Sequence, residues 1–212
     1  AGRIPPAAEA LLRAGLAGRA PDTPKAADPA FAATRTVLIG TNFQALLAAR
    51  AKAEELGYSA LLLTSRLTGE AREMAGLFLG MAKDVAAHGL PLARPACVIA
   101  GGETTVTLRG AGKGGRNQEM ALAYLAGLAA GPAEAEEAVF LSASTDGSDG
   151  PTDAAGAFAS AEILRQARER GLDPFAALAA NDSYTFFDAL GRLLKTGPTN
   201  TNVCDIHVLI VP

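Results

Sequence analysis

Short apolar runs alternate with helix-like segments over the first half of the chain, and this alternation constrains the fold more than any other feature. The expected strands lie at 36–40, 58–65 and 96–110, the last with a bend or hairpin at Gly101–Gly102. Helix-like segments separate them at 42–56 and 70–88. Continuous apolar strands that alternate with helices favour a mostly parallel or mixed sheet with helices on both faces. The sequence therefore predicts an α/β fold.

The remaining segments extend this pattern less regularly. A helix over 7–16 precedes a Pro-rich connector. Further helices are expected at 117–128, 154–170, 174–179 and 184–190, with strands at 138–146 and in the last apolar run before Pro212.

Composition excludes several classes of function. The 212 residues are 49% hydrophobic and 19% charged, as in ordinary globular proteins, and the net charge of −3 argues against a nucleic-acid surface. No apolar run reaches membrane-spanning length, and no secretion signal is evident, so we expect a cytoplasmic protein. Cys97 and Cys204 are interpreted as reduced thiols, and neither His88 nor His207 lies in a motif.

A glycine-rich loop at 110–115 carries cations and opens into a helix. A helix N-terminus adds about half a positive charge, and Lys113 and Arg116 add full charges beside it. This combination suits a phosphate or carboxylate. The residues predicted to bind such a ligand are Gly102, Thr104, Gly112, Gly114 and Gly115.

The same glycines also spell a dinucleotide fingerprint, G-x-G-x-x-G, at Gly110, Gly112 and Gly115. The fingerprint needs an acidic residue about 20 positions further on, whereas the next strand ends at Asp146, well beyond that spacing. A tight turn with solvated cations is the structural alternative.

Two polar loops follow later strands. The segment 144–156 places Asp146 and Asp149 in one loop, where they could hold Mg²⁺ together with phosphate oxygens. Asp153 is expected to cap a helix that starts at Ala154. In 196–205, Thr199 and Asn200 could donate hydrogen bonds to an anionic ligand or could satisfy their own loop.

In this order, GGETTVTLRGAGKGGRNQE, STDGSDGPTDAAGA and TGPTNTNV resemble the MOFRL domain of type II glycerate 2-kinases. The resemblance covers residues 21–211. It implies an N-terminal helix and connector at 1–30, the closing part of a Rossmann-like domain at 31–95, and a smaller α/β MOFRL domain at 96–212. Family members are longer, so it also implies a preceding domain with a cleft lysine that has no counterpart here.

The resemblance implies phosphorylation of D-glycerate at its 2-hydroxyl, with ATP and Mg²⁺ as cofactors. Arg116 matches a catalytic arginine, and Glu103, Asn117, Glu119 and Asp146 match polar members of the same motifs. Phosphoryl transfer needs positioned cations more than covalent chemistry, and Lys113 is a second candidate charge. Asp146 or Asp149 could carry Mg²⁺, or one of them could orient the substrate hydroxyl, so Asp146 is also a catalytic candidate.

Two alternatives remain open at this point. One is an NAD(P)-dependent hydroxypyruvate reductase, which fits the literal fingerprint but lacks a histidine in a motif. The other is a non-catalytic module that binds a sugar acid or phosphate. A homodimer is also left open.

Overall fold

The computed structural model describes residues 4–131 and 137–212, which divide into two compact units, Ala1–Ile39 and Gly40–Pro212. The first unit contains helix α1 (Pro6–Leu16) and the short 3-10 helix η1 (Pro29–Phe31), and neither buries a residue. The second unit holds the sheet, the core and every candidate site residue.

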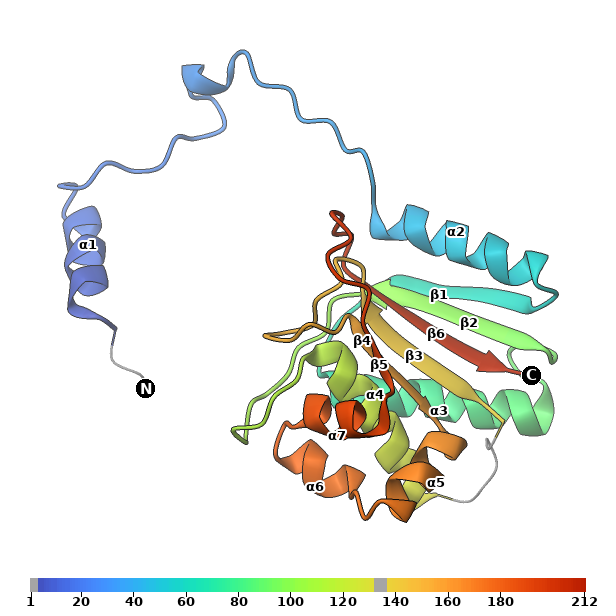
Figure 1. Ribbon diagram of the computed structural model, residues 1–212. Helices are drawn as coiled ribbons and strands as arrows, with labels where there is room; N and C mark the ends of the chain where they lie inside the picture. Colours follow the sequence, from blue (N-terminus) through green and yellow to red (C-terminus); the bar gives the residue numbers. More distant parts are fainter. Residues whose placement is uncertain (1–3, 132–136) are drawn as a thin grey trace. The chain divides into compact units, whose positions relative to one another are not determined.

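A six-stranded mixed sheet in the order β1-β2-β6-β3-β4-β5 forms the centre of the second unit (Figure 1). Its strands are β1 (Ser59–Leu67), β2 (Ala96–Gly102), β3 (Val139–Ser144), β4 (Gly156–Ser160), β5 (Leu193–Leu194) and β6 (Asp205–Val211). Only β1 and β2 run parallel, and the other pairs are antiparallel. The expected α/β fold with a mixed sheet is confirmed.

Helices cover both faces of this sheet. Helix α2 (Asn42–Glu55) packs on β1 and β2, whereas α3 (Ala71–His88) and α4 (Arg116–Ala130) pack on the opposite face (Figure 1). Three shorter helices, α5 (Ala161–Glu169), α6 (Pro174–Ala179) and α7 (Ser183–Leu190), contact α4. No helix among the described residues is long and apolar enough to cross a membrane.

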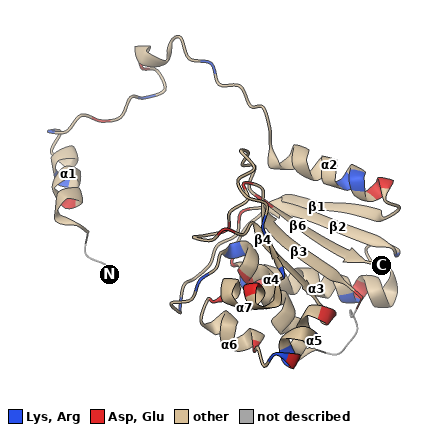
Figure 2. Ribbon diagram, in the orientation of Figure 1, with Lys and Arg blue, Asp and Glu red and all other residues tan. Residues whose placement is uncertain are grey.

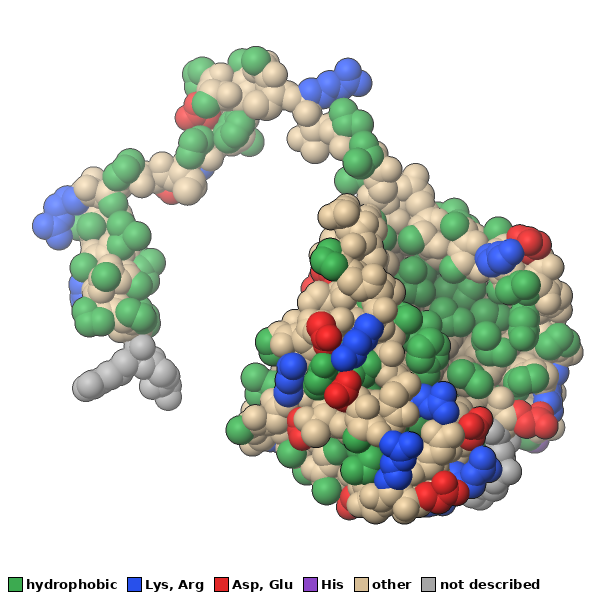
Figure 3. Space-filling model, in the orientation of Figure 1, with side chains coloured by type: hydrophobic (Ala, Val, Ile, Leu, Met, Phe, Trp, Pro, Cys, Tyr) green, Lys and Arg blue, Asp and Glu red, His purple; other side chains and the backbone are tan. Residues whose placement is uncertain are grey.

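The main core lies between the sheet and the α3–α4 layer. Phe78, Tyr124 and Phe140 are fully buried there, with ring centroids about 5 Å apart: 4.8 Å for Phe78–Phe140 and 5.0 Å for Tyr124–Phe140. The other face is covered less completely, and apolar side chains are visible beside α2 (Figure 3). Charged residues gather in the loops and on the outer helices, whereas the middles of the strands are uncharged (Figure 2).

Three expected elements are wrong. The run at 36–40 is not a strand, and Val37, Leu38 and Ile39 are 63%, 78% and 95% exposed. An apolar run becomes a strand only where a neighbour completes its hydrogen bonds, and the described residues supply none. The segment after Gly102 forms only an isolated bridge, Glu70 to Thr105. The strand expected over 96–110 therefore ends where β2 ends.

The third error concerns 154–170, where an alanine-rich segment was expected to be one helix. Strand β4 occupies its first part and pairs with β3, and α5 begins only after Ser160, which caps it. A Cβ on Gly156 would lie 1.9 Å from the carbonyl oxygen of Ser142, so this pairing requires glycine. Asp153 consequently caps no helix and accepts a hydrogen bond from Tyr184 instead.

The domain boundary predicted between 95 and 96 stays a prediction. In the described residues, β1 from the expected Rossmann-like part pairs with β2 from the expected MOFRL part, within one compact unit that begins at Gly40.

Candidate functional site

The site forms where β2 ends and β6 begins. These strands are antiparallel, and Gly102 pairs with Asp205, so motifs far apart in the sequence become neighbours. Gly102 has a φ of 147°, and a Cβ there would lie 2.2 Å from the carbonyl oxygen of Leu67. The Gly101–Gly102 pair therefore allows close packing at this strand end, and Glu103 follows directly beside it.

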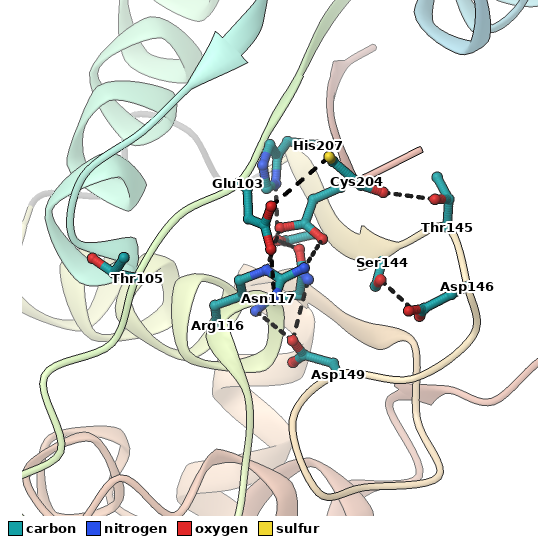
Figure 4. Close-up of polar contacts among 12 residues, drawn as sticks. Glu103, Thr105, Arg116, Asn117, Ser144, Thr145, Asp146, Asp149, Cys204 and His207 are labelled. Carbon is teal, nitrogen blue, oxygen red and sulfur yellow. Dashed lines mark hydrogen bonds and ion pairs between the residues drawn. The ribbon is translucent and has the colours of Figure 1, made fainter. Parts of the chain in front are cut away.

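Arg116, at the first position of α4, is the central cation of the site (Figure 4). Its Nε lies 2.6 Å from Oδ2 of Asp205, and its Nη2 lies 2.9 Å from Oδ1. Nη1 lies 3.5 Å from Glu103. The hydrogen bonds to Asp205 raise the pKa of Arg116 further above its usual range. A two-point pair of this kind fixes the plane of the guanidinium as well as its position.

Asp205 is the functional candidate that the sequence reasoning missed. Its side chain is fully buried, whereas Arg116 is 28% exposed, so the pair holds the cation with its remaining donors toward solvent. Asp205 follows Cys204, whose φ of 64° is in the left-handed region. Cys204 is held there because its carbonyl accepts hydrogen bonds from the backbone and hydroxyl of Thr145. Such strain persists where surrounding contacts determine the conformation.

The N-terminus of α4 is not the open anion cradle that the sequence suggested. The carboxylate of Asp149 accepts hydrogen bonds from the backbone N–H groups of Asn117 and Gln118, at 3.1 and 2.9 Å. Both side-chain amides donate to it as well, at 3.2 and 3.0 Å. The protein therefore supplies its own anion to the positive end of this helix.

The side chain of Asp149 is buried, only 1% exposed, and this burial affects its pKa. Burial raises its pKa, and the four N–H donors oppose that shift. Both oxygens face α4, so the predicted metal role of Asp149 does not fit its position. Asn117, also fully buried, serves this network rather than a ligand.

The loop glycines are required mainly by packing within the protein. A Cβ on Gly110 would lie 2.2 Å from the carbonyl oxygen of Ala180, and one on Gly112 would lie 2.5 Å from Cβ of Asp182. A Cβ on Gly115 would lie 2.3 Å from Cγ of Asp149. Every glycine of the literal fingerprint thus faces the protein's own backbone or side chains. The dinucleotide interpretation loses its physical basis.

Two further predicted residues are engaged elsewhere. Lys113 places Nζ 3.9 Å from the ring centroid of Tyr184, a cation–π contact. Glu119 is buried and accepts hydrogen bonds from Arg72 at 2.8 Å and from Asn181 at 2.8 Å. Glu119 therefore joins α3, α4 and the turn before α7.

Asp146, Thr199 and Asn200 lie in a second cluster, to one side of Arg116. Asp146 accepts a hydrogen bond from Ser144 at 2.8 Å (Figure 4). It also accepts one from Asn202 at 3.2 Å. Thr199 donates to the carbonyl of Thr145 at 2.6 Å, and Asn200 has a φ of 58°. The described residues contain no group of three or more His, Cys, Asp or Glu side chains that could hold a metal. The Mg²⁺ role of Asp146 stays a prediction: its side chain is half-buried, and its oxygens accept hydrogen bonds from Ser144, Ser148 and Asn202.

A cavity of about 460 Å³ adjoins Arg116 on the side of the glycine loop. Five predicted residues line it besides Arg116: Thr104, Gly112, Gly114, Gly115 and Glu119. Apolar and small side chains complete the wall: Val106, Leu108, Pro151 and Ser183 among them. The structure thus brings Thr104 and the glycine loop together at one cavity, beside the Arg116–Asp205 pair.

His207 lies beneath the site in a buried polar chain. Its Nδ1 lies 2.9 Å from Oγ of Ser142, and the Ser142 hydroxyl donates to Oδ1 of Asn117 at 2.8 Å. Ser142 therefore accepts from Nδ1–H, and the imidazole is neutral. Burial lowers the pKa of His207 to about 4.

This histidine predicts a specific dependence of stability on pH. The ordinary histidine pKa is 6.5, so the unfolded state binds the proton first as the pH falls. The free energy of unfolding should decrease from about pH 6.5 to about pH 4, by about 3 kcal/mol from this group. Urea unfolding of wild type and His207→Asn across this range measures the effect, because asparagine keeps an N–H toward Ser142 without titrating. Equal slopes for the two proteins would contradict it.

The sequence profile of the MOFRL family matches residues 96–205, which contain Arg116, Asp205 and the residues that line the cavity. The chain belongs to the MOFRL family. A glycerate 2-kinase from Pyrococcus horikoshii is 38% identical over 211 residues, covering 99% of this chain and 46% of the relative. An Agrobacterium vitis protein named as a hydroxypyruvate reductase is 41% identical over 210 residues, covering 98% of this chain and 45% of the relative.

Among solved structures, glycerate kinase from Thermotoga maritima matches this MOFRL protein with a TM-score of 0.79 and 39% sequence identity. The match covers 84% of this chain and 42% of that one. The chain spans about half the length of the curated relatives it matches.

Proposed function

We propose that this chain forms part of an ATP- and Mg²⁺-dependent glycerate 2-kinase, which converts D-glycerate to 2-phosphoglycerate. The observation that carries the proposal is the guanidinium of Arg116, fixed by buried Asp205 at the edge of a cavity. Relatives that are 38% and 39% identical to this chain carry the glycerate kinase name.

The reaction would transfer the terminal phosphoryl group of ATP to the 2-hydroxyl of glycerate. The P–O bond to ADP breaks, the new P–O bond forms to the 2-oxygen, and the hydroxyl proton leaves. Negative charge on the transferring group must be balanced throughout. Asp205 accepts hydrogen bonds from Nε and Nη2 of Arg116. The remaining N–H groups of Nη1 and Nη2 are left for phosphoryl or carboxylate oxygens.

Of the two carboxylates that contact Arg116, only Glu103 is exposed. Its side chain is 62% exposed, whereas that of Asp205 is fully buried. Glu103 is therefore the group that could accept the hydroxyl proton. Asp146 would hold Mg²⁺, which supplies charge neutralisation on the phosphate oxygens when bound.

A coupled assay on the complete natural protein tests this function. We expect ADP formation that requires both D-glycerate and Mg²⁺, with 2-phosphoglycerate as the product. NADH oxidation by hydroxypyruvate, without ATP turnover that responds to glycerate, would overturn the proposal. Binding of glycerate without turnover in calorimetry would indicate a binding module instead.

A further inference from the structure

The cavity beside Arg116 contains a polar group without a partner. Thr104 is 3% exposed and lines the cavity, and its hydroxyl has no hydrogen-bond partner in the described part of the chain. A buried hydroxyl without a partner costs about 1–3 kcal/mol. Because Thr104 is one of the lining residues, a molecule bound in the cavity can complete this hydrogen bond once the Thr104 side chain rotates toward it.

The other walls define what kind of molecule fits. Val106, Leu108 and Pro151 give the cavity an apolar side, and its glycines present peptide faces without side chains. Glu119 adds little free negative charge, because both its oxygens already accept hydrogen bonds, one from Arg72 and the other from Asn181. The cavity therefore has an apolar side, and Arg116 is the cation among its lining residues.

Glycerate does not match these walls. It is a three-carbon acid with an oxygen function on every carbon, so it has almost no apolar surface. A cavity of about 460 Å³ is within the size range of sites for much larger ligands. A nucleotide has the required combination of a flat base, a ribose with polar atoms and an anionic tail.

We propose that this cavity binds the nucleoside end of the phosphate donor, with its phosphates directed to Arg116 and a polar atom of the nucleoside bonded to the Thr104 hydroxyl. The inference rests on the proposed function for the identity of the nucleotide. It places glycerate outside the cavity, on the Glu103 side of the arginine.

Calorimetry with ADP, adenosine and D-glycerate tests the assignment on the complete natural protein. Thr104→Val preserves shape and removes the hydroxyl. We expect it to weaken ADP and adenosine binding about tenfold, leave glycerate affinity unchanged, and leave the midpoint of thermal unfolding unchanged or higher. Thr34→Val, at an exposed threonine outside the compact sheet unit, serves as the matched control.

A second variant protects the test against misfolding. Leu108 is 76% exposed, so Leu108→Asp can place a charge on the apolar wall without disturbing the core. It should weaken ADP and adenosine binding at least tenfold. Wild-type ADP affinity in both variants, or a selective loss of glycerate affinity, would overturn the assignment.

The two proposals can fail separately. If the protein makes no ADP from glycerate but loses ADP binding in Thr104→Val, the cavity assignment stands and the kinase proposal falls. If it phosphorylates glycerate and both variants keep wild-type nucleotide affinity, the kinase proposal stands and the cavity assignment falls.

Discussion

Replacing Arg116 with alanine should lower kcat for glycerate phosphorylation by at least about a hundredfold, the scale on which lost electrostatic stabilisers act. Arg116 is the cation that Asp205 fixes at the cavity, so no nearby side chain can assume its geometry. Steady-state kinetics with ADP detection measures the loss. Arg165→Ala, which removes a 69% exposed cation on α5, is the control and should leave kcat unchanged.

Asp205→Asn gives an intermediate test of the same arrangement. Asparagine keeps the shape but offers one acceptor instead of two, so the guanidinium loses its fixed plane. We expect a kcat loss between those of the control and Arg116→Ala, with a smaller change in KM.

The prediction for Arg116→Ala can also fail. If that variant lowers kcat tenfold or less, Arg116 is a structural cation and does not stabilise the transferring phosphoryl group.

Replacing Asp149 with alanine should lower the free energy of unfolding by about 3 kcal/mol or more. Three N–H donors, two of Asn117 and the backbone N–H of Gln118, would lose their acceptor in a buried position, whereas Nε2 of Gln118 keeps Thr152 as a partner. Each unsatisfied donor costs about 1–3 kcal/mol before relaxation or hydration. The first turn of α4 would also lose the anion that opposes its dipole. Urea unfolding followed by circular dichroism measures the change.

Two variants make this prediction specific. Asp149→Asn retains an acceptor but no charge and should fall between wild type and alanine. Asp153→Ala removes an exposed carboxylate of the same loop, whose polar partners among the described residues are Tyr184 and Lys195, and should cost less than about 1 kcal/mol. Equal losses for Asp149→Ala and Asp153→Ala would show that Asp149 does not stabilise the helix end.

The sequence predicted the helices best, because residues close in sequence determine where a helix begins and ends. The helix expected at 70–88 appears as α3 and ends at Gly89, whose φ of 65° suits glycine. The run at 36–40 has equally clear strand character, yet it is exposed. Strand formation depends on neighbours that can be distant in sequence, so local pattern alone does not decide it.

Part of the predicted motif does come together in the structure, because Thr104 and Arg116 line one cavity and Glu103 lies 3.5 Å from Arg116. The roles predicted for these residues stay predictions. The role of Asp149 was misassigned, because nothing local shows that its carboxylate reaches a helix N-terminus. One pattern in the sequence could have indicated Asp205: with His207 it forms D-x-H in an otherwise apolar strand. A spacing of two places both polar side chains on the same face of the strand.

The position of β6 has a consequence for how the molecule folds. It lies between β2 and β3 although it follows every other strand in the chain. The pair β1–β2 and the group β3–β4–β5 can each form from nearer contacts, but only β6 joins them, and contacts of such long sequence separation form slowly. Because β6 also begins with Asp205, the step that unites the two half-sheets is the step that orients Arg116. A partly folded intermediate without β6 therefore has no formed site, and recovery of ligand binding during refolding should track closure of the sheet.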